Sequence, residues 1–297
     1  YRGATLVWLR NLLGGAMFGV GMTLASGCGN KTLVRLGEGN MKSVVVVIIM
    51  AIAVWWMLFS NFGYLVFLQW MIPSAIDFSS WGIPSQDISA VFFGLADVET
   101  SAIHGLVIAL LVALPLLAWI MRDRDFRANR ELLFAGVAIG LLVVIAWYVT
   151  AGPTGIALLE ELDFKDQRPF FTGAQSFTFI GPAGHVGQYI LQGFSPIYLT
   201  FGVVIFAGVA VGSFLFTVIF RKIRIEWFAS WHDFFMHAVG AVLMGIGGVL
   251  GLGCTIGQGV TGVSTLAIGS FLTLFAIIAA SAATMKFQFY LMMREDG

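Results

Sequence analysis

Long runs of hydrophobic residues, separated by short polar or charged stretches, dominate this chain. They fall roughly at 12–25, 44–72, 102–121, 132–149, 197–220, 234–252 and 263–285. A helix needs about 20 residues to cross a bilayer, so the pattern predicts a series of transmembrane helices. A membrane barrel would need alternating polar and apolar residues, and these runs do not alternate.

Two of the runs have the wrong length for one upright span. The run 44–72 is too long, which predicts either a break near Asn61 and Gly63 or a strongly tilted helix. The run 12–25 is too short, unless a loop lies inside the membrane and a second half-helix follows at 31–36.

Composition supports the membrane assignment. Of 297 residues, 59% are hydrophobic and 11% are charged, and the mean hydropathy is +0.91. Soluble domains are about a quarter charged. We therefore expect an all-α, polytopic membrane protein that forms a single transmembrane domain over 1–297. The net charge of zero gives no reason to expect nucleic acid as a partner.

Charged residues between the runs predict the orientation, because cytoplasmic loops are enriched in Lys and Arg. The stretches 122–131 and 221–224 are basic, whereas 73–101 has no Lys or Arg. We expect the basic stretches to be cytoplasmic, and 73–101 and a long loop at about 151–196 to be external. That loop is predicted to fold back through a tight Gly181–Pro182 turn, and either caps an external mouth or packs without a role in transport.

Two glycine-rich stretches, 19–29 and 245–255, contain the chain's only cysteines, Cys28 and Cys254. Aligning the two cysteines also pairs other residues at the same offset: Gly14 with Gly240, Gly19 with Gly245, Gly21 with Gly247, Leu24 with Leu250, and Gly27 with Gly253. We therefore expect an internal pseudo-symmetric repeat, with halves at about 5–125 and 197–292. Each half would carry a broken or re-entrant helix with a Gly–Cys loop.

Paired interrupted helices indicate a transporter's binding site. The positive ends of half-helices starting after each cysteine would attract an anion. A thiol is a polarisable, weak donor and suits a sulfur-bearing ligand better than it suits sulfate. The predicted pathway residues are Gly27, Cys28, Gly29, Asn30, Lys31, Arg35, Gly253, Cys254, Thr255 and Gln258.

Each of these features also has a plain structural interpretation. Free cysteines are often simply buried, and Lys31 and Arg35 would reach lipid headgroups as readily as they would form a cationic vestibule. Glu38 is expected to pair with Arg35 or Lys42. Glycines spaced four apart, such as Gly15 and Gly19 or Gly136 and Gly140, are expected at helix contacts.

Other chemistry at the cysteines has less support. No histidine lies near either cysteine in sequence, so no metal site is expected. A disulfide would require the two Cα atoms to come within about 7 Å. Arg10 and the basic stretch 221–224 both predict cytoplasmic entry of the helix that follows, which leaves open whether the repeat is parallel or inverted.

The stretches 25–40 and 251–259 resemble the YeeE/YedE family of bacterial inner-membrane proteins, which includes thiosulfate uptake transporters. The stretch 175–184 resembles the family's central external segment. The resemblance implies an hourglass-shaped bundle whose constriction is lined by thiols that pass the ion along through S–H···S hydrogen bonds. Only Cys28 and Cys254 match that pattern, because the family's third cysteine is absent from these residues.

The resemblance also implies partners: a small sulfur-containing anion, membrane lipid, and a cytoplasmic TusA-like sulfur-carrier protein or membrane complex. The predicted function is uptake of thiosulfate or a related sulfur-containing anion, without enzyme activity and without a cofactor. Two alternatives remain at this stage. One is a non-transporting structural or accessory subunit that docks a partner, and the other is a membrane enzyme of sulfur transfer.

Overall fold

The computed structural model describes residues 1–96, 98, 101–163 and 173–295, and most of them are helical. The α-helices are α1 (Trp8–Leu24), α2 (Gly29–Gly37), α3 (Met41–Phe59), α4 (Gln69–Met71), α5 (Ile88–Leu95), α6 (Ala102–Arg122), α7 (Arg124–Ala128), α8 (Arg130–Ala151), α9 (Pro153–Asp163), α10 (Ile180–Leu191), α11 (Phe201–Ile219), α12 (Trp231–Leu250) and α13 (Ile268–Glu295). Shorter π or 3-10 segments are η1 (Tyr64–Leu68), η2 (Ile72–Ser74), η3 (Phe78–Trp81), η4 (Pro196–Tyr198), η5 (Gly257–Gly262) and η6 (Val263–Thr265). One small sheet pairs β1 (Thr5–Leu6) with β2 (Ile76–Asp77) in antiparallel register.

Within the described residues, seven helical stretches are long and apolar enough to cross a membrane. They are Trp8–Gly37, Met41–Phe59, Ile103–Arg122, Arg130–Leu162, Phe201–Ile219, Trp231–Leu250 and Ile268–Arg294. This confirms the prediction of an all-α, multi-pass membrane protein.

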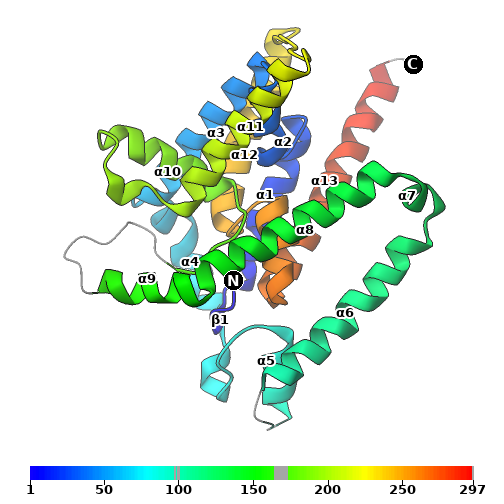
Figure 1. The fold of residues 1–297 in the computed structure, drawn as a ribbon. Helices are drawn as coiled ribbons and strands as arrows, with labels where there is room; N and C mark the ends of the chain where they lie inside the picture. Colours follow the sequence, from blue (N-terminus) through cyan, green and yellow to red (C-terminus); the bar gives the residue numbers. More distant parts are fainter. Residues whose placement is uncertain (97, 99–100, 164–172, 296–297) are drawn as a thin grey trace.

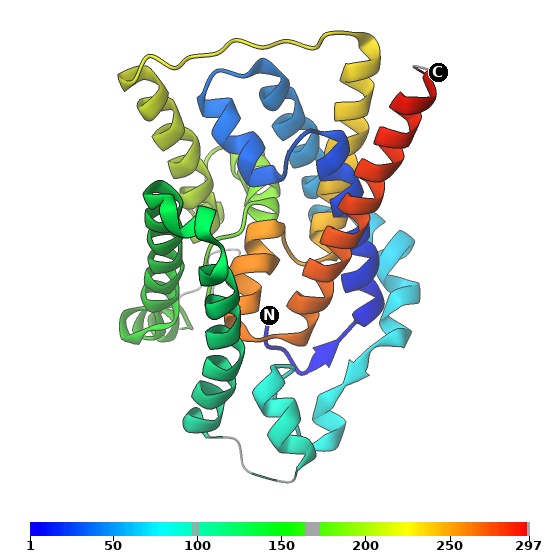
Figure 2. The same ribbon diagram turned by 90° about the vertical axis from the view of Figure 1, so that its right-hand side faces the viewer.

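The helices α1 and α12 lie against each other at the centre of the bundle and run in opposite directions (Figure 2). A methyl group on Gly21 would lie 2.6 Å from the carbonyl oxygen of Gly240, and one on Gly247 would lie 2.7 Å from that of Gly14. Only glycine permits such close approach of two backbones. Two of the aligned pairs, Gly14 with Gly240 and Gly21 with Gly247, therefore lie in the contact between these two helices.

The entry side that Arg10 suggests for α1 differs from the one in the structure. β1, just before α1, pairs with β2 in the stretch 73–101, so α1 begins at that end of the molecule. α12 begins at the opposite end, after the basic stretch 221–224 (Figure 2). The charge pattern left the relative direction of the two helices open, and in the structure they begin at opposite ends. Arg10 lies inside α1 with its Nε buried, whereas the charge rule concerns loops.

The run 44–72 is broken as expected. α3 ends at Phe59, and Ser60 is extended, with φ −120° and ψ 164°. The chain then turns back so closely that a methyl group on Gly63 would lie 2.7 Å from the carbonyl oxygen of Met57. The break near Asn61 and Gly63 is therefore confirmed.

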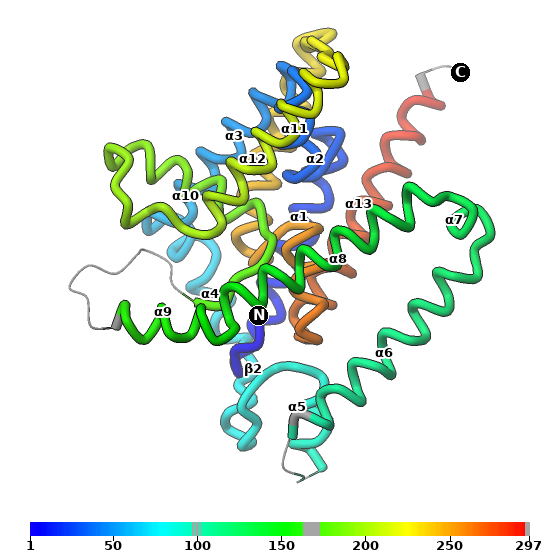
Figure 3. Tube along the Cα trace, viewed as in Figure 1, coloured from blue at the N-terminus to red at the C-terminus, as the bar shows by residue number. Residues whose placement is uncertain are grey.

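The described part of the stretch 151–196 contains α9 and α10, and residues 164–172 lie outside the described residues. The predicted tight turn at Gly181–Pro182 is wrong, because both residues lie in the first turn of α10. Proline is tolerated there because the amides of a first turn have no partner within the helix. Figure 3 traces α10 beside α3, where a methyl group on Gly184 would lie 2.6 Å from Val54.

In Figure 1, α6 lies to one side of the central bundle and α8 crosses in front of it. Their large apolar side chains point outward, and Trp119 and Phe134 are 74% and 77% exposed. A methyl group on Gly136 or Gly140 would meet nothing within 4 Å, so this pair makes no helix contact. Gly15 and Gly19 instead pack against Thr273 and Ile277 of α13. In a bilayer the outward surface of α6 and α8 suits lipid chains.

Candidate functional site

The helices α1 and α12 end through the same set of backbone hydrogen bonds. After α1, the N–H of Gly27 donates to the carbonyl oxygen of Met22 over 2.9 Å. After α12, the N–H of Gly253 donates to that of Gly248 over 2.8 Å. These are the six-to-one bonds of a Schellman motif, and they occur at positions that align between the two halves. Both helices are therefore terminated by the local sequence at equivalent points.

Each motif needs one residue in the left-handed region, and here it is not glycine. Ser26 has φ 59° and Leu252 has φ 60°. A non-glycine residue in this conformation costs about 1–2 kcal/mol. The two loops therefore share a strained residue two positions before each cysteine.

A new helical segment begins directly after each thiol. The carbonyl oxygen of Cys28 accepts from the N–H of Thr32 over 2.9 Å, and that of Cys254 accepts from the N–H of Gln258 over 2.7 Å. The sulfur of Cys254 also accepts from the N–H of Gly257 over 3.3 Å. Each cysteine therefore stands at the start of a half-helix, α2 in one case and residues leading into η5 in the other.

The two loops converge on one apolar cluster. Cys254 is wholly buried and Cys28 is half-buried, and both pack against the cluster that contains Phe18, Met50, Met244 and Ile180. Ile180, the first residue of α10, contacts both sides: methyl groups on Gly29 and Gly248 would lie 3.1 Å and 2.7 Å from its side chain.

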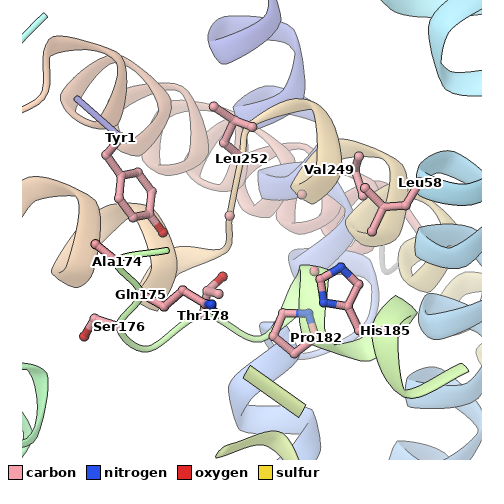
Figure 4. Close-up of a pocket in the computed structure, with 13 residues that line it drawn as sticks. Tyr1, Leu58, Ala174, Gln175, Ser176, Thr178, Pro182, His185, Val249 and Leu252 are labelled. Atoms are coloured by element: carbon pink, nitrogen blue, oxygen red, sulfur yellow. The ribbon is translucent and has the colours of Figure 1, made fainter. Parts of the chain in front are cut away.

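A cavity of about 410 Å³ opens beside the Cys254 loop (Figure 4). Its walls come from the end of α12, the stretch before α10, and α10 itself, and include Gly253, Leu252, Thr178, Pro182, His185 and Tyr1. The Tyr1 phenol hydrogen-bonds with Thr178. Most of this outer cavity is apolar, with a few hydroxyl and amide groups.

A second cavity, of about 270 Å³, lies beside the Cys28 loop and is polar. Its lining includes Ser26, Arg35, Lys42, Glu226, Asp233 and His237. Because α1 and α12 are antiparallel, their loops face opposite ends of the bundle. This inner cavity therefore lies on the side of the basic stretch 221–224, and the outer cavity lies on the side of β1 and β2.

The predicted pathway residues fall into two groups. Cys28, Cys254, Gly29 and Gly253 border the cluster or the outer cavity, and Arg35 lines the inner cavity. The others make local contacts and line neither cavity. The exposed Lys31 lays its chain on Gly27, Asn30 and Thr255 are half-buried, and Gln258 is buried with its Nε2 donating to Gly251.

Sequence reasoning missed most of the inner cavity. Glu38 was expected to pair with Arg35 or Lys42, but Lys42 forms an ion pair with Asp233, with Nζ and Oδ2 2.7 Å apart. Asn40 donates from its side-chain amide to Glu226 over 2.7 Å. These partners lie far apart in the sequence, so no spacing rule could have paired them.

Two broken helices, a thiol at each break and a cavity on either side of a shared apolar cluster define a multi-pass membrane protein with the architecture of a broken-helix transporter. Comparison with known sequences gives the family. A family model described as Sulphur transport matches residues 1–283. The chain therefore belongs to this family. The resemblance to YeeE/YedE proteins is thereby confirmed.

Two relatives carry the name Thiosulfate transporter TsuA. The protein from Escherichia coli (strain K12) is 28% identical over 269 residues, which are 87% of this chain and 68% of the relative. The protein from Spirochaeta thermophila is 26% identical over 270 residues, 88% of this chain and 72% of the relative.

Proposed function

We propose that this protein carries thiosulfate, or a related sulfur-containing anion, into the cytoplasm across the bacterial inner membrane. The anion would pass the thiols of Cys28 and Cys254. One observation carries the proposal: two matched loops bring both thiols to a single cluster with a cavity at each end. The names of the two relatives support thiosulfate as the substrate.

The thiol geometry suits a passing anion better than a trapped one. The sulfur of Cys254 accepts from the Gly257 amide, which leaves its S–H proton free to donate elsewhere. A thiol is a weak donor, so each contact holds the anion only loosely. Conduction needs binding that is strong enough for entry and weak enough for release.

The described conformation is closed at the cluster. Cys254 is wholly buried, and Ile180 fills the space between the glycines of the two loops. Transport through this point therefore requires Ile180 to move. Arg35, in the inner cavity, would supply positive charge on the cytoplasmic side of that step. The basic end of the molecule, which includes the stretch 221–224, would also be the docking surface for a TusA-like carrier.

Uptake of radiolabelled thiosulfate into proteoliposomes tests the proposal. We expect Cys28→Ala and Cys254→Ala each to lower the initial rate at least tenfold, because each removes an S–H donor from the narrowest part of the pathway. Cys28→Ser and Cys254→Ser should keep part of the rate, since a hydroxyl also donates.

The matched control is Gly140→Ala on the lipid-facing α8, where the new methyl group meets nothing within 4 Å, and its uptake rate should equal that of the parent. If both alanine variants fold and transport like the parent, the thiols do not form the pathway. A parent protein that carries no thiosulfate alone, but co-purifies with a stoichiometric partner, would favour an accessory subunit instead.

A further inference from the structure

The inner cavity contains an imidazole, and the geometry shows which of its two nitrogens carries a hydrogen. His237, in the second turn of α12, is 8% exposed and lines the cavity. Its Nδ1 lies 2.8 Å from the backbone oxygen of Asp233 and 3.0 Å from Oδ1 of the same residue. Both neighbours are acceptors, so Nδ1 carries the hydrogen. The other ring nitrogen, Nε2, is therefore the atom that gains or loses a proton.

We infer that the inner cavity is a second anion site, which binds a divalent sulfur oxyanion together with one proton on Nε2 of His237. The inference deepens the proposed function and rests on it. The first argument for this site is the balance of positive and negative side chains that line the cavity. Around His237, α12 contributes Asp233, α3 contributes Lys42, α2 contributes Arg35, and the stretch before α12 contributes Glu226.

Among the described residues, the remaining helices add no charged side chain to the lining of this cavity. α1 contributes the Ala25 and Ser26 end of its loop, and its one charged residue, Arg10, lies at its opposite end. On α10, His185 lines the outer cavity. Two cations thus face two carboxylates, and the cavity is neutral while His237 is neutral. One bound proton gives it a net positive charge, which favours an anion.

The second argument for an anion site is that hydrogen-bond donors in the cavity are available to a ligand. Lys42 is already engaged, because it pairs with Asp233 over 2.7 Å and lies 5.7 Å from the centre of the Phe228 ring. Arg35 makes a long hydrogen bond of 3.4 Å to the carbonyl oxygen of Ser26, which leaves most of its five donors for a ligand. The guanidinium of Arg35 and a protonated Nε2 of His237 would bind the anion from two sides.

The site also explains how the anion would be released from the inner cavity. Imidazole is the side chain that titrates between pH 5 and 8. Once the proton has left, Nε2 is an acceptor and no longer binds the anion. Anion and proton would leave together, which couples release to the pH of the inner compartment.

Calorimetric titration of the purified full chain with thiosulfate tests this at pH 6 and pH 8, in two buffers with different ionisation enthalpies. One linked proton makes the affinity fall by up to about tenfold per pH unit. We expect the parent to bind more tightly at pH 6, with uptake of about one proton per anion. His237→Gln keeps a side-chain donor but cannot become charged, so it should bind with no proton uptake.

The variant Arg35→Gln tests whether the anion binds in this cavity. Arg35→Lys is the control that keeps the positive charge. We expect Arg35→Gln to weaken binding about tenfold, the effect of losing one charge-assisted hydrogen bond, and Arg35→Lys to recover part of it. Proton-independent binding by the parent overturns the inference without any variant. Proton uptake by His237→Gln, or parental affinity in Arg35→Gln, also overturns it. Failure of the parent both to bind and to transport thiosulfate refutes the proposed function itself.

Discussion

The contact between α1 and α12 leads to a sharp prediction for Gly247→Ala. The added methyl group would lie 2.5 Å from the backbone nitrogen of Phe18, 2.7 Å from the carbonyl oxygen of Gly14 and 2.9 Å from the Cβ of Met17. Two of these three atoms belong to the backbone, so no side-chain rotation relieves the overlap. The two helices would have to separate along their length.

The size of the effect follows from two opposing terms. Overpacking a well-packed contact costs about 1–3 kcal/mol, and an overlap with backbone belongs at the upper end of that range. Replacing a helical glycine with alanine returns about 1 kcal/mol. We therefore expect Gly247→Ala to lower the free energy of unfolding by about 2 kcal/mol.

Unfolding by SDS in mixed micelles, followed by circular dichroism, measures this change. The matched control is Gly136→Ala in α8, where a methyl group meets nothing within 4 Å. The control gains helix propensity without an overlap, so its stability should equal or exceed that of the parent. Equal stability of Gly247→Ala and Gly136→Ala would refute the close contact of α1 and α12.

Two further predictions concern the loops and the end of the molecule that carries β1 and β2. Replacing Ser26 or Leu252 with glycine removes the left-handed strain, so each variant should gain about 1 kcal/mol in free energy of unfolding, measured in the same micelles, and an unchanged value would contradict the Schellman geometry. Burial alone would raise the pKa of Asp87, but hydrogen bonds from Ser85, Ser89, the Ala90 amide and Arg2 outweigh it, and the pKa is lowered. The stability that Asp87 contributes is therefore present above its unfolded pKa of about 3.9 and lost as the pH falls through the folded value. Melting temperatures from pH 3 to pH 7 should fall less steeply at acid pH for Asp87→Asn than for the parent, and identical slopes would refute this assignment.

Much of the fold was predictable because its signals are local. Hydrophobic length located the helices, and the excess length of the run 44–72 correctly indicated the break that follows Phe59. The alignment of Gly21 with Gly247 picked out residues that lie in one contact. Such features can be predicted from sequence because a glycine permits close helix contact and an overlong hydrophobic run cannot form one upright span, whatever the rest of the fold.

The parts that were missed depend on residues brought together by the fold. Lys42 and Asp233 form an ion pair across 191 positions, which no helical spacing encodes. Arg10 gave the wrong entry side because a charge inside a helix carries no information about loops. Gly181 and Pro182 resemble a turn in sequence, and only the packing of α10 on α3 makes them the start of a helix.

The glycine contact between α1 and α12 also bears on how the protein can move. Separating these helices would expose backbone to lipid at several glycines at once. We therefore expect the two helices to stay in contact and to keep both thiols at a fixed separation. At the start of α10, by contrast, a methyl group on Gly181, next to Ile180, would meet nothing within 4 Å. The proposed passage past the two thiols would therefore need a movement of the Ile180 side chain, while α1 and α12 stay in contact.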